Sequence, residues 1–68
     1  MPSAVIRSYS YNAETRELSV IFRSGVHYVY LDVPPDAFDA LNAAFSKGEY
    51  FQSRIRSNYA FRREDESP

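Results

Sequence analysis

The sequence predicts an α+β fold in which a three-stranded antiparallel β-meander is followed by two α-helices packed on one of its faces. In the first half of the 68-residue chain, β-branched and aromatic residues form short runs separated by turn residues, which is typical of strands. In the second half, apolar residues follow helical spacing behind proline and capping signals. Because all strands precede both helices, an antiparallel sheet with a helix layer on one side is expected.

Three strands are expected before residue 32. The first covers residues 4–11 and is followed by a polar connection over 12–16. The second and third cover 18–23 and 26–31, and only Ser24 and Gly25 separate them. This dipeptide is a two-residue hairpin signal, because glycine readily adopts the positive φ that a primed turn needs.

The loop length of this hairpin decides which side chains face the helices. With a two-residue loop, Ile21 lies opposite Tyr28 and Ser19 lies opposite Tyr30, and both tyrosines lie on the open face together with Arg23. A three-residue loop shifts the register by one residue and buries both tyrosines. The dipeptide favours the first arrangement, so we expect an open sheet face that carries the two tyrosines.

The first helix is expected to begin at residues 34–36. Proline is preorganised for a first helical turn, and Asp36 suits the positive end of the helix dipole. Phe38, Leu41 and Phe45 then form one apolar stripe, which predicts that all three pack on the sheet and that the helix ends near Phe45.

A second helix is expected from Ser46. Ser46 and Glu49 have the spacing of a capping box, and Phe51 and Ile55 lie four residues apart on one helical face. The chain is therefore expected to form a single domain over residues 1–61, with a flexible charged tail over 62–68.

Composition argues against several kinds of site. Cysteine is absent and His27 is the only histidine, so neither a disulfide nor a zinc site is expected, and we predict no cofactor. No residues form a recognisable nucleophile and base constellation with His27, which predicts a protein that is not an enzyme. There is no apolar run of the length that spans a membrane and no signal pattern at the N-terminus, so a cytoplasmic location without membrane contact is expected.

Charge is distributed unevenly along the chain. The formal net charge is −1, yet residues 47–63 carry five basic side chains and a single acidic one, Glu49. A local basic patch attracts polyanions even when the whole protein is slightly acidic. Three acidic residues at 64–66 follow this basic segment.

The motifs together resemble the KTSC family, a short domain that also occurs at the C-terminus of some lysyl-tRNA synthetases. The resemblance covers most of residues 4–59, and its central feature is a Tyr-x-Tyr motif at Tyr28 and Tyr30. Its other anchors are Tyr11, Glu14-Thr15-Arg16, Leu18, Phe22-Arg23-Ser24-Gly25, Val33-Pro34-Pro35, Ser46-Lys47-Gly48 and Ile55-Arg56. Ala13 departs from the proline that is common there, which affects only a turn. The family has no assigned function, and the resemblance raises the expectation of RNA binding.

Two binding hypotheses follow. In the first, RNA bases stack on an open tyrosine face, as single-stranded RNA does on other sheets, while basic side chains meet the phosphates. The candidate RNA-binding residues are Tyr28, Tyr30, Arg23, Lys47, Arg54 and Arg56. In the second, the domain binds a protein partner or itself through a free strand edge or the tyrosine face.

Overall fold

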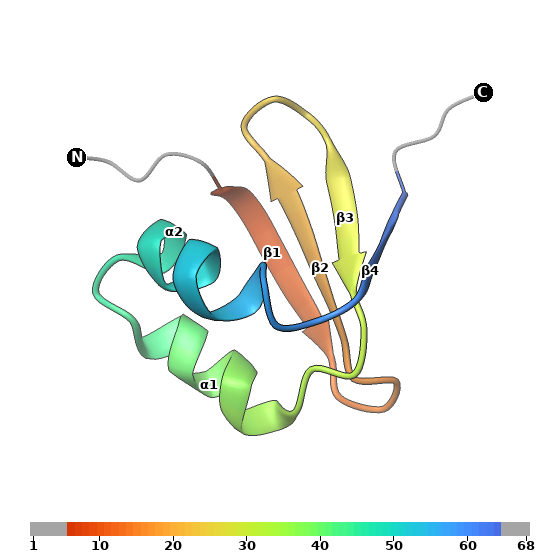
Figure 1. The fold of residues 1–68 in the computed structure, drawn as a ribbon, viewed down its shortest axis with the longest axis vertical. Helices are drawn as coiled ribbons and strands as arrows, with labels where there is room; N and C mark the ends of the chain where they lie inside the picture. The colour runs from red at the N-terminus through yellow and green to blue at the C-terminus, as the bar shows by residue number, and fades with distance from the viewer. Residues whose placement is uncertain (1–5, 65–68) are drawn as a thin grey trace.

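The computed structural model describes residues 6–64 and shows a four-stranded antiparallel sheet in the order β1-β2-β3-β4. The strands are β1 (Ile6–Asn12), β2 (Glu17–Phe22), β3 (His27–Tyr30) and β4 (Phe61–Arg63). The helical layer consists of α1 (Pro35–Ala43) and α2 (Lys47–Tyr50), and α2 continues directly into a π-helical turn, η1 (Phe51–Ile55). Both helices lie on the same side of the sheet (Figure 1). The α+β prediction is confirmed, with one strand more than expected; residues 4 and 5 of the first predicted strand lie outside the described residues.

The hairpin between β2 and β3 has a three-residue loop. Leu18 pairs with Tyr30 and Val20 with Tyr28, so the loop comprises residues 23–25. Gly25 has φ +97°, and its N–H donates to the carbonyl of Phe22 at 2.8 Å, as in the three-residue hairpins that end on a left-handed residue. The prediction of a two-residue loop is therefore wrong, and so is the assignment of the faces that depended on it.

The hydrophobic core lies between the sheet and the helices. Leu18 and Val20 of β2 and Tyr30 of β3 point toward the helical layer, and each is at most 2% exposed. Tyr11, on the same face, donates a hydrogen bond from its hydroxyl to the carbonyl of Val33 at 2.6 Å and so ties β1 to the entry of α1. The complete buried cluster is Leu18, Val20, Tyr30, Val33, Leu41, Phe51 and Ile55.

Helix α1 starts as the sequence predicts, with Pro35 in its first turn followed by Asp36, but it ends at Ala43. Ala44 is already extended, with φ −66° and ψ 142°, so Phe45 lies outside the helix and is fully exposed. The prediction that Phe45 packs on the sheet is therefore wrong, because the helix that would direct it there ends two residues earlier.

The start of α2 is capped by Ser46, whose Oγ accepts the N–H of Glu49 at 3.3 Å. This contact confirms the predicted N-cap. Phe51 and Ile55 are both at most 1% exposed, as the four-residue spacing predicts.

Strand β4 replaces part of the predicted flexible tail. It pairs with β3, and the N–H of Leu31 donates to the carbonyl of Ala60 at 2.8 Å just beyond that ladder. The guanidinium of Arg62 contacts the carboxylate of Glu17 at 3.2 Å and therefore links β4 to β2 across β3. Within residues 6–64, none of the helices has the length and apolarity that crossing a bilayer requires.

Candidate functional site

The two tyrosines of the Tyr-x-Tyr motif lie on the helix-covered face of the sheet. Tyr30 is 2% exposed and packs edge-on against Phe51, with ring centroids 5.3 Å apart. A ring buried in this way has no free face for a base, so the prediction that Tyr30 stacks RNA is wrong. Tyr28 lies nearer the rim of the same face and is only partly buried.

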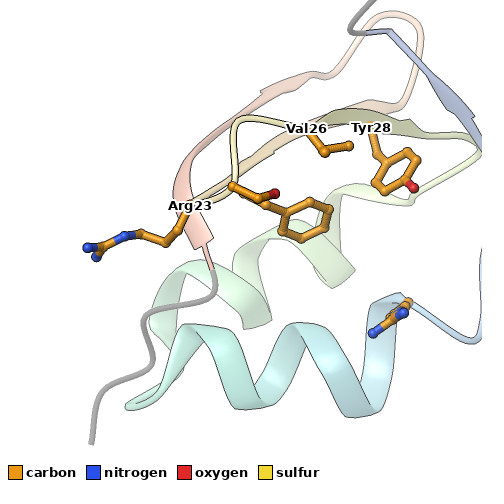
Figure 2. Close-up of a pocket in the computed structure, with 6 residues that line it drawn as sticks. Arg23, Val26 and Tyr28 are labelled. Carbon is orange, nitrogen blue, oxygen red and sulfur yellow. The ribbon is translucent and has the colours of Figure 1, made fainter.

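A pocket of about 340 Å³ opens beside Tyr28, between the β2–β3 hairpin and the end of the helical layer. We call it the Tyr28 pocket; Figure 2 shows Val26 and Tyr28 on its sheet side. Its volume lies at the lower end of the range for small-molecule sites. It is lined by Phe22, Arg23, Ser24, Val26, Tyr28 and Arg56.

Both charged residues that line the Tyr28 pocket are basic. Arg56 reaches it from the turn after η1, and its guanidinium donates to Oε1 of Gln52 at 2.9 Å, which helps to position the side chain. Arg23 stands at the opposite rim in the hairpin loop, with its side chain extending away from Tyr28 (Figure 2). Burial raises the pKa of the Tyr30 hydroxyl, and the positive charge of Arg56 partly offsets this shift. Because the two charged residues that line the pocket are both arginines, its electrostatic potential favours an anionic ligand.

The other two predicted cations lie elsewhere. The Nζ of Lys47 donates to the carbonyl of Ala44 at 3.3 Å. Arg54 lies over the ring of Tyr50, with its guanidinium carbon 5.9 Å from the centroid, beside a second and wider hollow that Phe45 also lines. The structure thus brings together Arg23, Tyr28 and Arg56 and separates them from Lys47 and Arg54.

Three aromatic rings form a row along the edge of the Tyr28 pocket, and only one of them, Tyr28, is among the site residues predicted from the sequence. Tyr28 contacts Phe22 on one side, with centroids 5.5 Å apart, and Phe61 of β4 on the other, with centroids 5.0 Å apart. Phe61 is 52% exposed. We call Phe22, Tyr28 and Phe61 the aromatic row. The apolar character of Phe61 was the only available signal, since a three-residue strand has too little pattern to be recognised.

On the opposite, uncovered face of the sheet, Ser19 and His27 are joined by a short hydrogen bond between Oγ and Nε2. The register expected from a two-residue loop places these residues on different faces, so the sequence did not predict a partner for His27. A catalytic serine also needs a group that orients the imidazole and donors for an oxyanion. Within residues 6–64, His27 makes no hydrogen bond to a carboxylate, and no three potential metal ligands converge.

Similar proteins include both whole proteins of this size and a segment of a larger one. A lysine–tRNA ligase of Nostoc punctiforme is 38% identical over 58 residues, which are 85% of this chain but 10% of the ligase. The chain therefore spans about one tenth of that relative. An uncharacterised protein of Stutzerimonas stutzeri is 36% identical over 59 residues, which cover 87% of this chain and 83% of that protein.

A solved structure shows the same fold. The crystal structure of a KTSC domain protein from Yersinia pestis superimposes with a TM-score of 0.87 at 33% sequence identity, and the match covers 94% of this chain and 90% of the other. The family model described as the KTSC domain matches residues 2–59, which include the Tyr28 pocket and stop just before β4. The chain therefore belongs to the KTSC domain family.

Proposed function

We propose that this domain binds RNA without catalysing a reaction, and that the Tyr28 pocket is the centre of its binding surface. One observation carries the proposal: an aromatic pocket is flanked by two arginines, and no acidic residue lines it. Nucleotides combine a π-face with a phosphate, and arginine interacts favourably with both. A cytoplasmic location, where RNA is abundant, is part of the same proposal.

The similarity to lysine–tRNA ligases adds weight to RNA as the ligand class. In those relatives the matching segment belongs to an enzyme whose name includes tRNA, although the segment is only about 10% of the protein. A domain joined to such an enzyme has RNA nearby at high local concentration, so even weak contacts contribute to binding.

Arg56 and Arg54 provide a matched test of this site. They are two residues apart and both exposed, but only Arg56 lines the Tyr28 pocket. We expect Arg56→Ala to weaken binding of a short single-stranded RNA by at least about tenfold, because a charge-assisted hydrogen bond contributes roughly 1.5–3 kcal/mol. It should also reduce the logarithmic salt slope by about 0.7, the value for one neutralised phosphate on a single strand. Arg54→Ala should change neither quantity by a comparable amount.

The measurement is an NMR titration of labelled protein with a short RNA and with tRNA at two salt concentrations. Amide signals of residues 22–28 and 56 should move at low salt and move less at high salt. If neither RNA shifts these signals at low salt, the proposed function is wrong. Equal losses from the two arginine variants would instead mean that general charge attraction, and not this pocket, holds the RNA.

A protein partner, or a second copy of the chain, is the alternative function. The fully exposed ring of Phe45 favours it, because covering this large apolar side chain with a partner would remove apolar surface from water. Strand β1 also forms one edge of the described sheet and pairs only with β2. Concentration-dependent sedimentation without RNA affinity, reduced by Phe45→Ser, would support this alternative.

A further inference from the structure

Strand β4 places two more side chains on the face that carries the Tyr28 pocket. In the β3–β4 ladder, Tyr28 pairs with Arg63 and Tyr30 pairs with Phe61. Directly paired residues share a face of the sheet, so Phe61 and Arg63 lie on the side of the two tyrosines. Both residues lie beyond the family match, which ends at residue 59 and therefore assigns them no role.

Phe61 is the most exposed ring of the aromatic row. Its ring contacts Tyr28 at 5.0 Å and Tyr30 at 5.5 Å between centroids, yet 52% of the residue remains accessible. The two tyrosines therefore support it from one side and leave part of it open to solvent. An aromatic ring held in this way is suited to stacking with an unpaired base.

The neighbouring arginines of β4 lie on opposite faces. Arg63 pairs with Tyr28 on the pocket side, whereas Arg62 pairs with Val29 on the uncovered side. Arg62 also contacts the carboxylates of Glu17 and Glu64, at 3.2 Å and 2.6 Å. These two adjacent arginines thus lie on opposite faces of the sheet, Arg63 on the face of the aromatic row and Arg62 on the other face.

From this arrangement we propose that β4 completes the RNA site: Phe61 stacks with an unpaired base of a single-stranded segment and Arg63 contacts its phosphate. The inference rests on the proposed function and names the part of the RNA that this end of the site recognises. Base-paired RNA does not present a free base face to a protruding ring, so single strands are preferred over duplexes. In this proposal Phe61, which packs against Tyr30, has the stacking role that the sequence predicted for Tyr30.

The test compares four variants by fluorescence anisotropy with a labelled single-stranded RNA of about ten nucleotides and with its duplex. We expect Phe61→Ala to weaken single-strand binding about tenfold or more with an unchanged salt slope, since stacking is not a charge interaction. Phe61→Tyr keeps the ring and should retain binding. Arg63→Ala should reduce the salt slope by about 0.7, whereas Arg62→Ala should leave it unchanged.

A control shows whether β4 remains in place. The amide of Leu31 is bonded to the carbonyl of Ala60, so its chemical shift and exchange rate report the pairing of β4 in every variant. Wild-type binding that is sensitive to Arg56→Ala but unaffected by Phe61→Ala and Arg63→Ala overturns this inference alone. Equal effects of Arg62→Ala and Arg63→Ala, with Leu31 unchanged, also overturn it. Absence of any wild-type binding overturns the proposed function and this inference with it.

Discussion

Two phenylalanine residues in the helical layer should respond very differently to the same substitution. Phe51 is completely buried and packs edge-on against Phe22 and Tyr30, with centroids 5.6 Å and 5.3 Å away. Phe45, six residues earlier, is fully exposed. Replacing each by alanine removes the same atoms, so any difference in the free energy of unfolding comes from their surroundings.

The expected difference is large compared with the stability of so small a domain. Truncating a buried phenylalanine costs about 3–5 kcal/mol, because the lost burial is accompanied by a cavity. A chain of this length is stabilised by about 3–10 kcal/mol in total. Phe51→Ala should therefore remove about a third of the stability or more and lower the melting temperature by more than about 10 °C. Phe45→Ala should change the free energy of unfolding by no more than about 0.5 kcal/mol.

Urea unfolding followed by far-ultraviolet circular dichroism measures both values. The sequence pattern alone places Phe45 in the apolar stripe of the first helix and predicts a substantial loss for Phe45→Ala as well. If the two variants lost comparable stability, the exposed position of Phe45 and the end of α1 at Ala43 would both be wrong.

Two further predictions concern a buried hydroxyl and the hairpin turn. Burial raises the pKa of Tyr30 above its ordinary value of 10.0, so the unfolded chain loses this proton at a lower pH than the folded protein does. The contribution of Tyr30 to stability is therefore complete below pH 10 and is lost as the pH rises through the folded pKa. Tyr30→Phe should reduce this alkaline destabilisation in thermal unfolding between pH 9 and 11, and an unchanged pH profile would contradict the assignment. Gly25→Ala should lower the free energy of unfolding in urea by about 1 kcal/mol, because Gly25 has φ +97°, which an alanine rarely adopts. There is space for a Cβ at this position, so the cost comes from the backbone conformation, and a neutral effect would show that the turn changes conformation.

The order of elements was predictable because it depends on local patterns. Alternating apolar residues and turn signals identified the first three strands, and the Ser46 cap marked the start of α2. The C-terminal end of α1 was not predictable in the same way, since Phe45 continues the helical spacing of Leu41 although the backbone has already become extended at Ala44.

The side of the sheet on which the tyrosines lie was not fixed by local sequence. The same Ser24-Gly25 dipeptide is compatible with two loop lengths, and they differ only in whether Arg23 belongs to the strand or to the loop. The N–H of Phe22 donates to the carbonyl of Val26 at 2.9 Å, which makes the loop three residues long. The three-residue loop places Tyr28 and Tyr30 on the face where the helices pack. Which loop length forms therefore depends on contacts between distant parts of the chain.

The candidate site was predicted in part. Tyr28, Arg23 and Arg56 do line one pocket, although Arg56 is distant in sequence from the hairpin that carries the other two and the side chain of Arg23 extends away from Tyr28. The sequence did not show which of Arg54 and Arg56 lines the pocket. Their helical spacing places them on different sides of the helix but does not show which side faces the edge of the sheet. Phe61 could not be assigned at all, since its position depends on a pairing with β3 that has no local signal.

The pairing of β4 with β3 also has an entropic consequence. Tyr30 and Phe61 are 31 residues apart in the sequence, whereas the pairs between β1, β2 and β3 close only short hairpins. Closing a flexible loop of this length costs about 3 kcal/mol in chain entropy. The packing of Phe51 and Ile55 in the core already brings the chain back to the sheet, so only residues 56–60 remain to be closed. Much of the entropy cost of placing β4 is therefore met when the helices pack, and the strand that carries Phe61 depends on the helix layer for its place in the sheet.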